Sequence, residues 1–177
     1  MVKYLFSSKE IKMYGGISLI GWFHTIIGTA GIISGLYLLS RFKFIDIWSS
    51  LGKFYLTCTF ITSASSLFIY SATGSFNDAH FLSVLTMAAI CLALILDKKN
   101  LLGFLNIYAK ELALSVTVFF SMLPTTAEVL QRLPINDPFV DSIDDPLVLN
   151  FYISYVLIYG VFAIYQIVLI KRKVDKT

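Results

Sequence analysis

The sequence has few charged residues, and this scarcity decides the class of protein. Only 14% of its 177 residues are charged, whereas soluble domains carry roughly a quarter. With 57% hydrophobic residues and a mean hydropathy of +0.78, too few polar residues remain to cover a water-soluble domain. We therefore expect lipid to cover much of the surface.

Cysteine, histidine and catalytic motifs are also scarce. The two cysteines, Cys58 and Cys91, lie inside apolar segments, so neither a disulfide framework nor a C-x-x-C metal site is supported. A net charge of +3, dispersed along the chain, argues against nucleic acid as a partner. The sequence contains no G-x-S-x-G, H-E-x-x-H, phosphate-binding glycine loop or paired carboxylates, so we predict no catalytic residues.

Long uncharged segments predict membrane-spanning helices, since about 20 apolar residues cross a hydrocarbon core of about 30 Å. The first segment is too long for a cleavable signal, and no A-x-A-like site follows it. We predict an all-α polytopic membrane protein, with residues 1–177 forming a single transmembrane domain and a bundle of about five transmembrane helices. The spans are expected at about residues 14–40, 54–72, 80–96, 112–130 and 147–170.

The third span is expected to end at a charged segment that begins with Asp97. Residues 101–111 then place Lys110 and Glu111 among apolar neighbours, which favours an amphipathic segment lying in the membrane interface. Pro124 is predicted to kink the fourth span that follows.

The distribution of basic residues predicts the orientation. Ten of the fourteen lie on the side shared by the first and third connections and the carboxyl terminus, including residues 171–173 directly after the last span. By the positive-inside rule, the carboxyl terminus is cytoplasmic and the amino terminus lies outside. The acidic loop between the fourth and fifth spans then faces outward.

One face of the first span carries small residues and a histidine: Gly21, His24, Gly28, Gly31 and Gly35, spaced three, four, three and four. We call this set the glycine face. Small residues let another helix approach closely in a membrane, so the simplest interpretation is a packing groove for a partner helix. The alternative is a ligand groove in which haem b or a quinone lies flat, with His24 as ligand or hydrogen-bond donor.

His24 also has a structural interpretation. A neutral histidine inside a membrane can be satisfied by a nearby hydroxyl group, and the second span offers several candidates. These are Thr59, Thr62, Ser63 and Ser66.

Four further polar residues, which we call the outer polar cluster, are expected toward the outer side: Asp78, His80, Glu128 and Arg132. Together with His24 they could form one pocket. Their structural interpretations are a helix-end ion pair for Glu128 and Arg132, four residues apart, and a solvated loop cap for Asp78 and His80. As two ligands of one haem, His24 and His80 are awkward, because about 10 Å along the membrane normal separates them.

Several of these residues carry a resemblance to a family of bacterial membrane proteins with a domain of unknown function. The family reads approximately H-T-x-x-G in a glycine-rich first helix, H-R-x-x-G-x-x-Y entering the second, T-G-x-F-x-x-x-H entering the third, and E-x-x-x-R-x-P ending the fourth. The matching residues here are Phe23-His24-Thr25 through Gly35, Leu51-Gly52-Lys53-Phe54-Tyr55, Thr73-Gly74-Ser75-Phe76 with His80, and Glu128, Arg132 and Pro134.

The chain departs from this pattern at two places. Ser49-Ser50 stands where the family has His-Arg, and the histidine that is common at the start of the fourth helix is missing near residues 106–110. The resemblance covers roughly residues 15–134 and implies a bacterial inner (cytoplasmic) membrane.

For function, we expect a non-enzymatic membrane bundle, either an accessory or assembly subunit or a small transport-like protein. Its partners would be the lipid bilayer and a second copy or another membrane subunit. The alternative is a redox membrane protein that binds haem b or quinone through His24.

Overall fold

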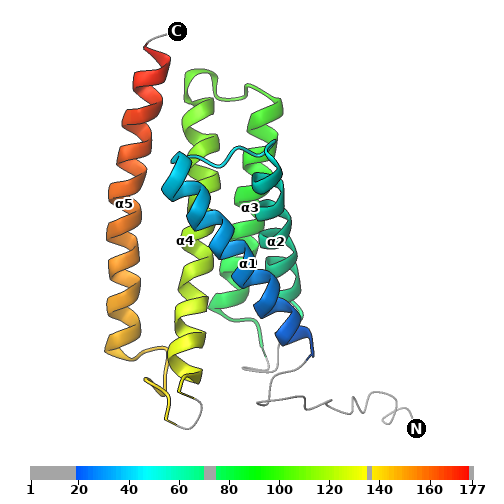
Figure 1. Ribbon diagram of the computed structural model, residues 1–177, viewed down its shortest axis with the longest axis vertical. Coiled ribbons are helices and arrows are strands. Elements are labelled where there is room, and N and C mark those ends of the chain that lie inside the picture. Colours follow the sequence, from blue (N-terminus) through cyan, green and yellow to red (C-terminus); the bar gives the residue numbers. More distant parts are fainter. Residues whose placement is uncertain (1–18, 70–74, 135–136, 176–177) are drawn as a thin grey trace, which may run out of the picture.

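The structure, a computed structural model, describes residues 19–69, 75–134 and 137–175 (Figure 1). Within these ranges it is helical and contains no β-strand, so the predicted all-α fold is confirmed. The elements are α1 (Leu19–Phe42), α2 (Ser50–Ser66), α3 (Asp78–Lys98), the short 3-10 helix η1 (Gly103–Leu105), α4 (Asn106–Arg132) and α5 (Pro146–Val174).

Four segments of the described chain are long and apolar enough to cross a membrane: α1, α3, the segment Gly103–Arg132 that contains α4, and α5. On α5, Leu157, Ile158, Val161 and Ile164 are 64–70% exposed, as expected for side chains that face lipid. Helix α2 is not among the four. With 17 residues it is about 25 Å long, close to the lower limit for spanning. The chain is therefore a multi-pass membrane protein.

The second helix differs from its predicted bounds at both ends. The Ser49 side chain caps the helix by accepting a hydrogen bond from the Gly52 N–H at 3.0 Å, so α2 begins at Ser50 rather than near residue 54. It ends at Ser66, and residues 67–69 lie outside it. Residues 70–72 of the predicted span lie outside the described residues, as do residues 14–18 of the first.

Residues 106–111, which the sequence predicts to lie in the membrane interface, form the first turns of the same helix as the fourth span. Helix α4 begins at Asn106, whose side chain donates to the Leu96 carbonyl at 2.7 Å and accepts from the Leu101 N–H at 3.1 Å. These bonds hold the connection against the end of α3, and α4 runs continuously from there through Pro124. The helix therefore exceeds the predicted span of 112–130 at both ends.

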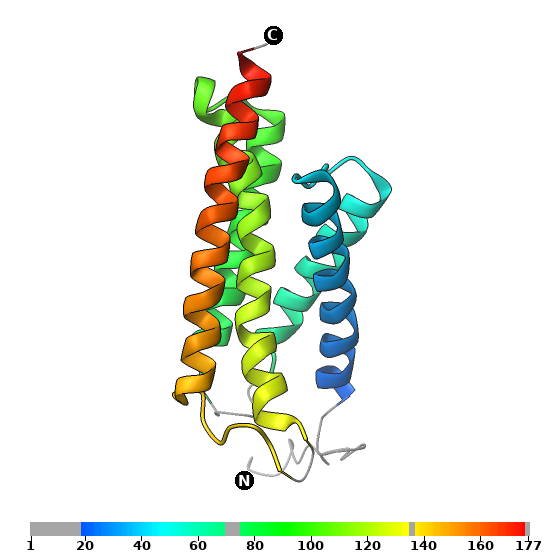
Figure 2. The same cartoon turned by 60° about the vertical axis from the view of Figure 1, so that its left-hand side comes forward.

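Successive helices run in alternating directions (Figures 1 and 2). The link of residues 43–49 between α1 and α2, the α3–α4 connection and the carboxyl terminus share one end, drawn at the top. We call it the C-terminal end. Helix α4 lies centrally and contacts α1, α3 and α5, while α2 packs against α1 and α3. In Figure 2, α2 runs obliquely behind α1.

The largest core cluster contains residues of the four helices α1, α2, α3 and α4 and of the 43–49 link. Tyr55, Leu114 and Ile45 are at most 2% exposed, so the link contributes to the core as the helices do. A smaller cluster lies near the opposite end, where α4, the loop after it and α5 meet. It contains Ala127, Leu130, Val140 and Val148.

Candidate binding site at the C-terminal end

The 43–49 link folds back into the bundle instead of running through solvent. Lys43 turns the chain with a φ of 68°, and Ile45 and Ile47 are 2% and 5% exposed. The Asp46 side chain then accepts from the Trp48 N–H at 2.9 Å, and its carbonyl accepts from the Ser49 hydroxyl at 2.8 Å. These bonds give the link a fixed shape ahead of α2.

Gln166 fastens the link to the bundle from α5. Its side chain is completely buried, donates to the Lys43 carbonyl at 2.6 Å and accepts from the Ser115 hydroxyl of α4 at 2.8 Å. Interhelical hydrogen bonds of this kind hold polar groups inside a membrane bundle. Three separate parts of the chain therefore meet at one amide group.

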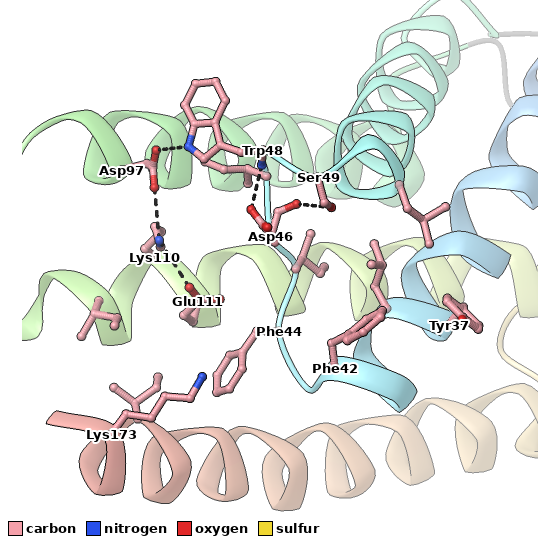
Figure 3. Close-up of a pocket in the computed structure, with 16 residues that line it drawn as sticks. Tyr37, Phe42, Phe44, Asp46, Trp48, Ser49, Asp97, Lys110, Glu111 and Lys173 are labelled. Atoms are coloured by element: carbon pink, nitrogen blue, oxygen red, sulfur yellow. Dashed lines mark hydrogen bonds and ion pairs between the residues drawn. The ribbon is translucent and has the colours of Figure 1, made fainter. Parts of the chain in front are cut away.

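Between the link and the ends of α1, α3, α4 and α5 lies a cavity of about 650 Å³, which we call the C-terminal cavity (Figure 3). Its volume falls within the range of sites that hold small molecules, about 300–1,000 Å³. Aromatic and aliphatic side chains form most of the wall. The aromatic residues are Tyr37, Phe42, Phe44 and Trp48, and the charged ones are Asp46, Asp97, Lys110, Glu111 and Lys173.

A chain of polar contacts runs along one side of the cavity (Figure 3). The Trp48 indole N–H donates to Asp97 Oδ2 at 2.9 Å, and Lys110 Nζ lies 3.1 Å from Asp97 Oδ1. Lys110 also lies 3.4 Å from Glu111 Oε1. The side chains of Asp97, Lys110 and Glu111 are only 12–22% exposed. Solvent therefore screens these two ion pairs less than it screens pairs on an open surface.

One oxygen of this network lacks a partner. Glu111 Oε2 is buried, and none of the described residues provides it with a hydrogen bond. An unsatisfied buried acceptor costs about 1–3 kcal/mol, so such an atom is uncommon and calls for an explanation. Lys173 approaches from α5, with its Nζ 4.6 Å from the centre of the Phe44 ring (Figure 3). The cavity thus combines apolar walls, paired charges and one unfilled acceptor.

The glycine face lies against α2 of the same chain. A Cβ added at Gly35 would lie 2.6 Å from the Tyr55 ring, and one at Gly28 would lie 3.0 Å from Thr62 Cγ2. Gly31 and Gly35 are buried, whereas Gly21 and Gly28 are partly buried. The close approach that glycine permits is thus used between two neighbouring helices of one chain.

His24 is partly buried and hydrogen-bonds through Nδ1 to the Ser65 hydroxyl at 3.1 Å. Ser65 is on α2, as expected, but it is not among the four hydroxyl residues named from the sequence. This contact and the covered glycine face give the region a structural role. Among the described residues no group of three His, Cys, Asp or Glu side chains could hold a metal ion.

Each member of the outer polar cluster has a local role in the structure. Glu128 and Arg132 form an exposed ion pair on α4. His80 is buried at the start of α3, where its backbone and ring bond to Asn77 in a capping box, and Asp78 lies exposed in the first turn. Each of these contacts is made within a single helix end. A pocket shared by the four residues stays a prediction.

Sequence reasoning missed the C-terminal cavity. It treated the 43–49 segment as a connection, although the alternation of Ile45 and Ile47 with polar neighbours was a signal of burial. It also read Asp97 as a span end, and Lys110 and Glu111 as interfacial. That these residues meet depends on how α3, α4 and the link pack, which one sequence does not reveal.

No protein-family model, no curated protein and no solved structure matches this chain. The family resemblance therefore stays a prediction. Two of the described residues on which the resemblance rests have structural partners of their own: Gly52 approaches the Asp46 carbonyl, and the Tyr55 hydroxyl lies 2.5 Å from Thr117 Oγ1.

Proposed function

We propose that this protein is a non-enzymatic membrane protein that binds a small amphipathic molecule in the C-terminal cavity, in an accessory or small transport-like role. The observation that carries the proposal is the cavity itself, about 650 Å³ in volume, with charged and apolar side chains lining the same space. A molecule with a polar head and an apolar tail matches that lining. A purely polar solute would leave the aromatic wall without a partner.

The position of the cavity supports this proposal. It lies at the C-terminal end, where nine of the ten described basic residues gather around the helix ends. These are Arg41, Lys43, Lys53, Lys98, Lys99, Lys110, Lys171, Arg172 and Lys173. By the positive-inside rule we propose that this end faces the cytoplasm, with the chain in the inner membrane of a bacterium. The ligand would then enter at the cytoplasmic boundary of the bilayer.

The accessory role also needs a partner, either a second copy or another membrane subunit. Because α2 covers much of the glycine face, we propose that such a partner contacts a different surface. The haem or quinone alternative finds less support, since a flat macrocycle against the glycine face would have to displace α2.

Fluorescence of Trp48 tests the proposed binding. In a Trp22→Phe background Trp48 is the only tryptophan, and it lines the cavity. With the protein in phosphatidylcholine nanodiscs, we expect amphiphiles with a dodecyl chain to change this fluorescence saturably. Simple partitioning into the bilayer would give a response that keeps rising with concentration.

Cavity-filling variants supply the control. Leu51→Phe combined with Ile107→Phe adds volume to the cavity wall, whereas Ile153→Phe combined with Ile164→Phe adds it on the exposed face of α5. The first pair should weaken the saturable response and the second should leave it intact. If no amphiphile of any charge gives a saturable response, the proposed function is wrong.

A further inference from the structure

We infer that the C-terminal cavity recognises a protonated primary amine on its amphipathic ligand, with Glu111 as the recognising carboxylate. This inference rests on the proposed function, because it names the ligand class of the same cavity. It draws on the charges of the lining residues, on the one unfilled acceptor and on the aromatic wall.

The charges of the cavity leave room for one more cation. Its lining contains three carboxylates and two ammonium groups, so the ionised groups carry an excess of one negative charge. This excess stands out because the surrounding C-terminal end is rich in lysine and arginine. Burying an anionic ligand here would add a like charge, whereas a cationic ligand would balance the lining.

The hydrogen bonds show where the cation would bind. Both oxygens of Asp97 already accept bonds, from Lys110 and from Trp48, and Glu111 Oε1 lies beside Lys110. Glu111 Oε2 is the atom that no described residue satisfies. The open position is therefore an acceptor, which an N–H donor fills and an ether, carbonyl or carboxylate oxygen does not. A donor that carries positive charge makes the stronger bond.

The aromatic wall also suits a cation with an apolar chain. The 43–49 link presents two rings that already hold ammonium groups, with Lys173 Nζ 4.6 Å from the centre of Phe44 and Lys53 Nζ 5.7 Å from that of Trp48. Aromatic faces attract cations within about 6 Å, and the same rings pack against hydrocarbon. The ligand class is thus a primary amine with an apolar chain, either a lipid with an amino headgroup or a free long-chain amine.

A panel of amphiphiles with one chain and different headgroups tests the inference at neutral pH. Trp48 fluorescence is titrated with dodecylamine, dodecyltrimethylammonium, dodecanol and dodecanoate in the Trp22→Phe protein. We expect dodecylamine to bind about tenfold or more tightly than the alcohol or the carboxylate, as for one charge-assisted hydrogen bond. The trimethylammonium compound, a cation without an N–H donor, should bind less tightly than the amine.

Glu111→Gln is the matching variant and Glu128→Gln its control. The first keeps the size of the side chain and its acceptor for Lys110 but removes the negative charge. The second changes a glutamate on the same helix, exposed and paired with Arg132 near the opposite end. We expect the preference for dodecylamine over dodecanol to be lost in the first variant and kept in the second. The melting temperatures of the two variants are measured to check that each is folded.

The lipid composition of the nanodiscs distinguishes the two sources of the amine. If phosphatidylethanolamine in place of phosphatidylcholine raises the apparent Kd of dodecylamine, the ligand is a lipid headgroup. An unchanged Kd indicates a free amine, and either result agrees with the inference. Dodecanol or dodecanoate binding as tightly as dodecylamine, or a preserved preference in folded Glu111→Gln, would overturn the amine inference alone. No saturable binding of any amphiphile would overturn the proposed function as well.

Discussion

Replacing Gly52 by alanine should destabilise the protein, although the position lies in the first turn of a helix where alanine is normally favoured. A Cβ at this position would lie 1.8 Å from the Asp46 carbonyl oxygen and 2.9 Å from Ser49 Oγ. The nearest atom belongs to the backbone of the 43–49 link, so it has no rotamer to change. The link must move away from α2 by an ångström or more.

The magnitude follows from three contributions. Forcing an extra methyl group into a packed position costs about 1–3 kcal/mol. Moving Ser49 away from the Gly52 N–H removes the cap of α2, at about 1 kcal/mol. The better helix propensity of alanine returns about 1 kcal/mol. The net loss is about 1–3 kcal/mol, or roughly 2–12 °C in Tm for a chain of this size.

Thermal unfolding in detergent measures this loss, with Gly160→Ala as the matched control. Gly160 lies in α5, and its added Cβ would meet no described atom within 4 Å. We expect Gly160→Ala to be neutral or slightly stabilising and Gly52→Ala to melt clearly lower. Equal melting temperatures for the two variants would refute the account of how the link packs on α2.

Three other substitutions test separate contacts. Gln166→Leu should cost about 1–3 kcal/mol, because the Lys43 carbonyl of the 43–49 link loses its buried donor, and Tm measures this loss. Gly35→Ala should lower Tm, because the added Cβ would lie 2.6 Å from the Tyr55 ring. Gly31→Ala should change Tm little, because its added Cβ would lie 3.4 Å from the nearest atom. A change in oligomeric state at equal stability would contradict this account. His24→Ala should cost about 1 kcal/mol through the lost bond to Ser65, and a visible spectrum with a haem band that this variant loses would instead favour the redox alternative.

Much of the fold could be predicted from the sequence, because the membrane limits what an apolar chain can do. Uncharged runs of about 20 residues predict helices, because a helix satisfies its own backbone hydrogen bonds in lipid. The predicted spans 80–96 and 147–170 lie within α3 and α5. The helices α2 and α4 begin before the spans predicted for them. The Ser49 side chain caps α2, which begins four residues before the predicted span. Helix α4 begins at Asn106, six residues before its predicted span, without a side-chain cap.

The candidate site could not be predicted, because it depends on packing between distant segments. Nothing in one sequence places Trp48 beside Asp97, or Gln166 beside the Lys43 carbonyl. Charged residues near span ends were assigned to the membrane interface, which is their commonest position. The same residues become partly buried when the 43–49 link folds over them.

The most direct test of the account is the position at which an amphipathic ligand binds. A dodecylamine analogue with a photoreactive group near its head would be cross-linked in nanodiscs, and the labelled peptides identified by mass spectrometry. Saturable labelling within residues 37–51, 107–111 and 170–173, reduced by competing dodecylamine, is the predicted result. Labelling spread along the exposed face of α5, with no effect of the competitor, would contradict a binding site in the C-terminal cavity.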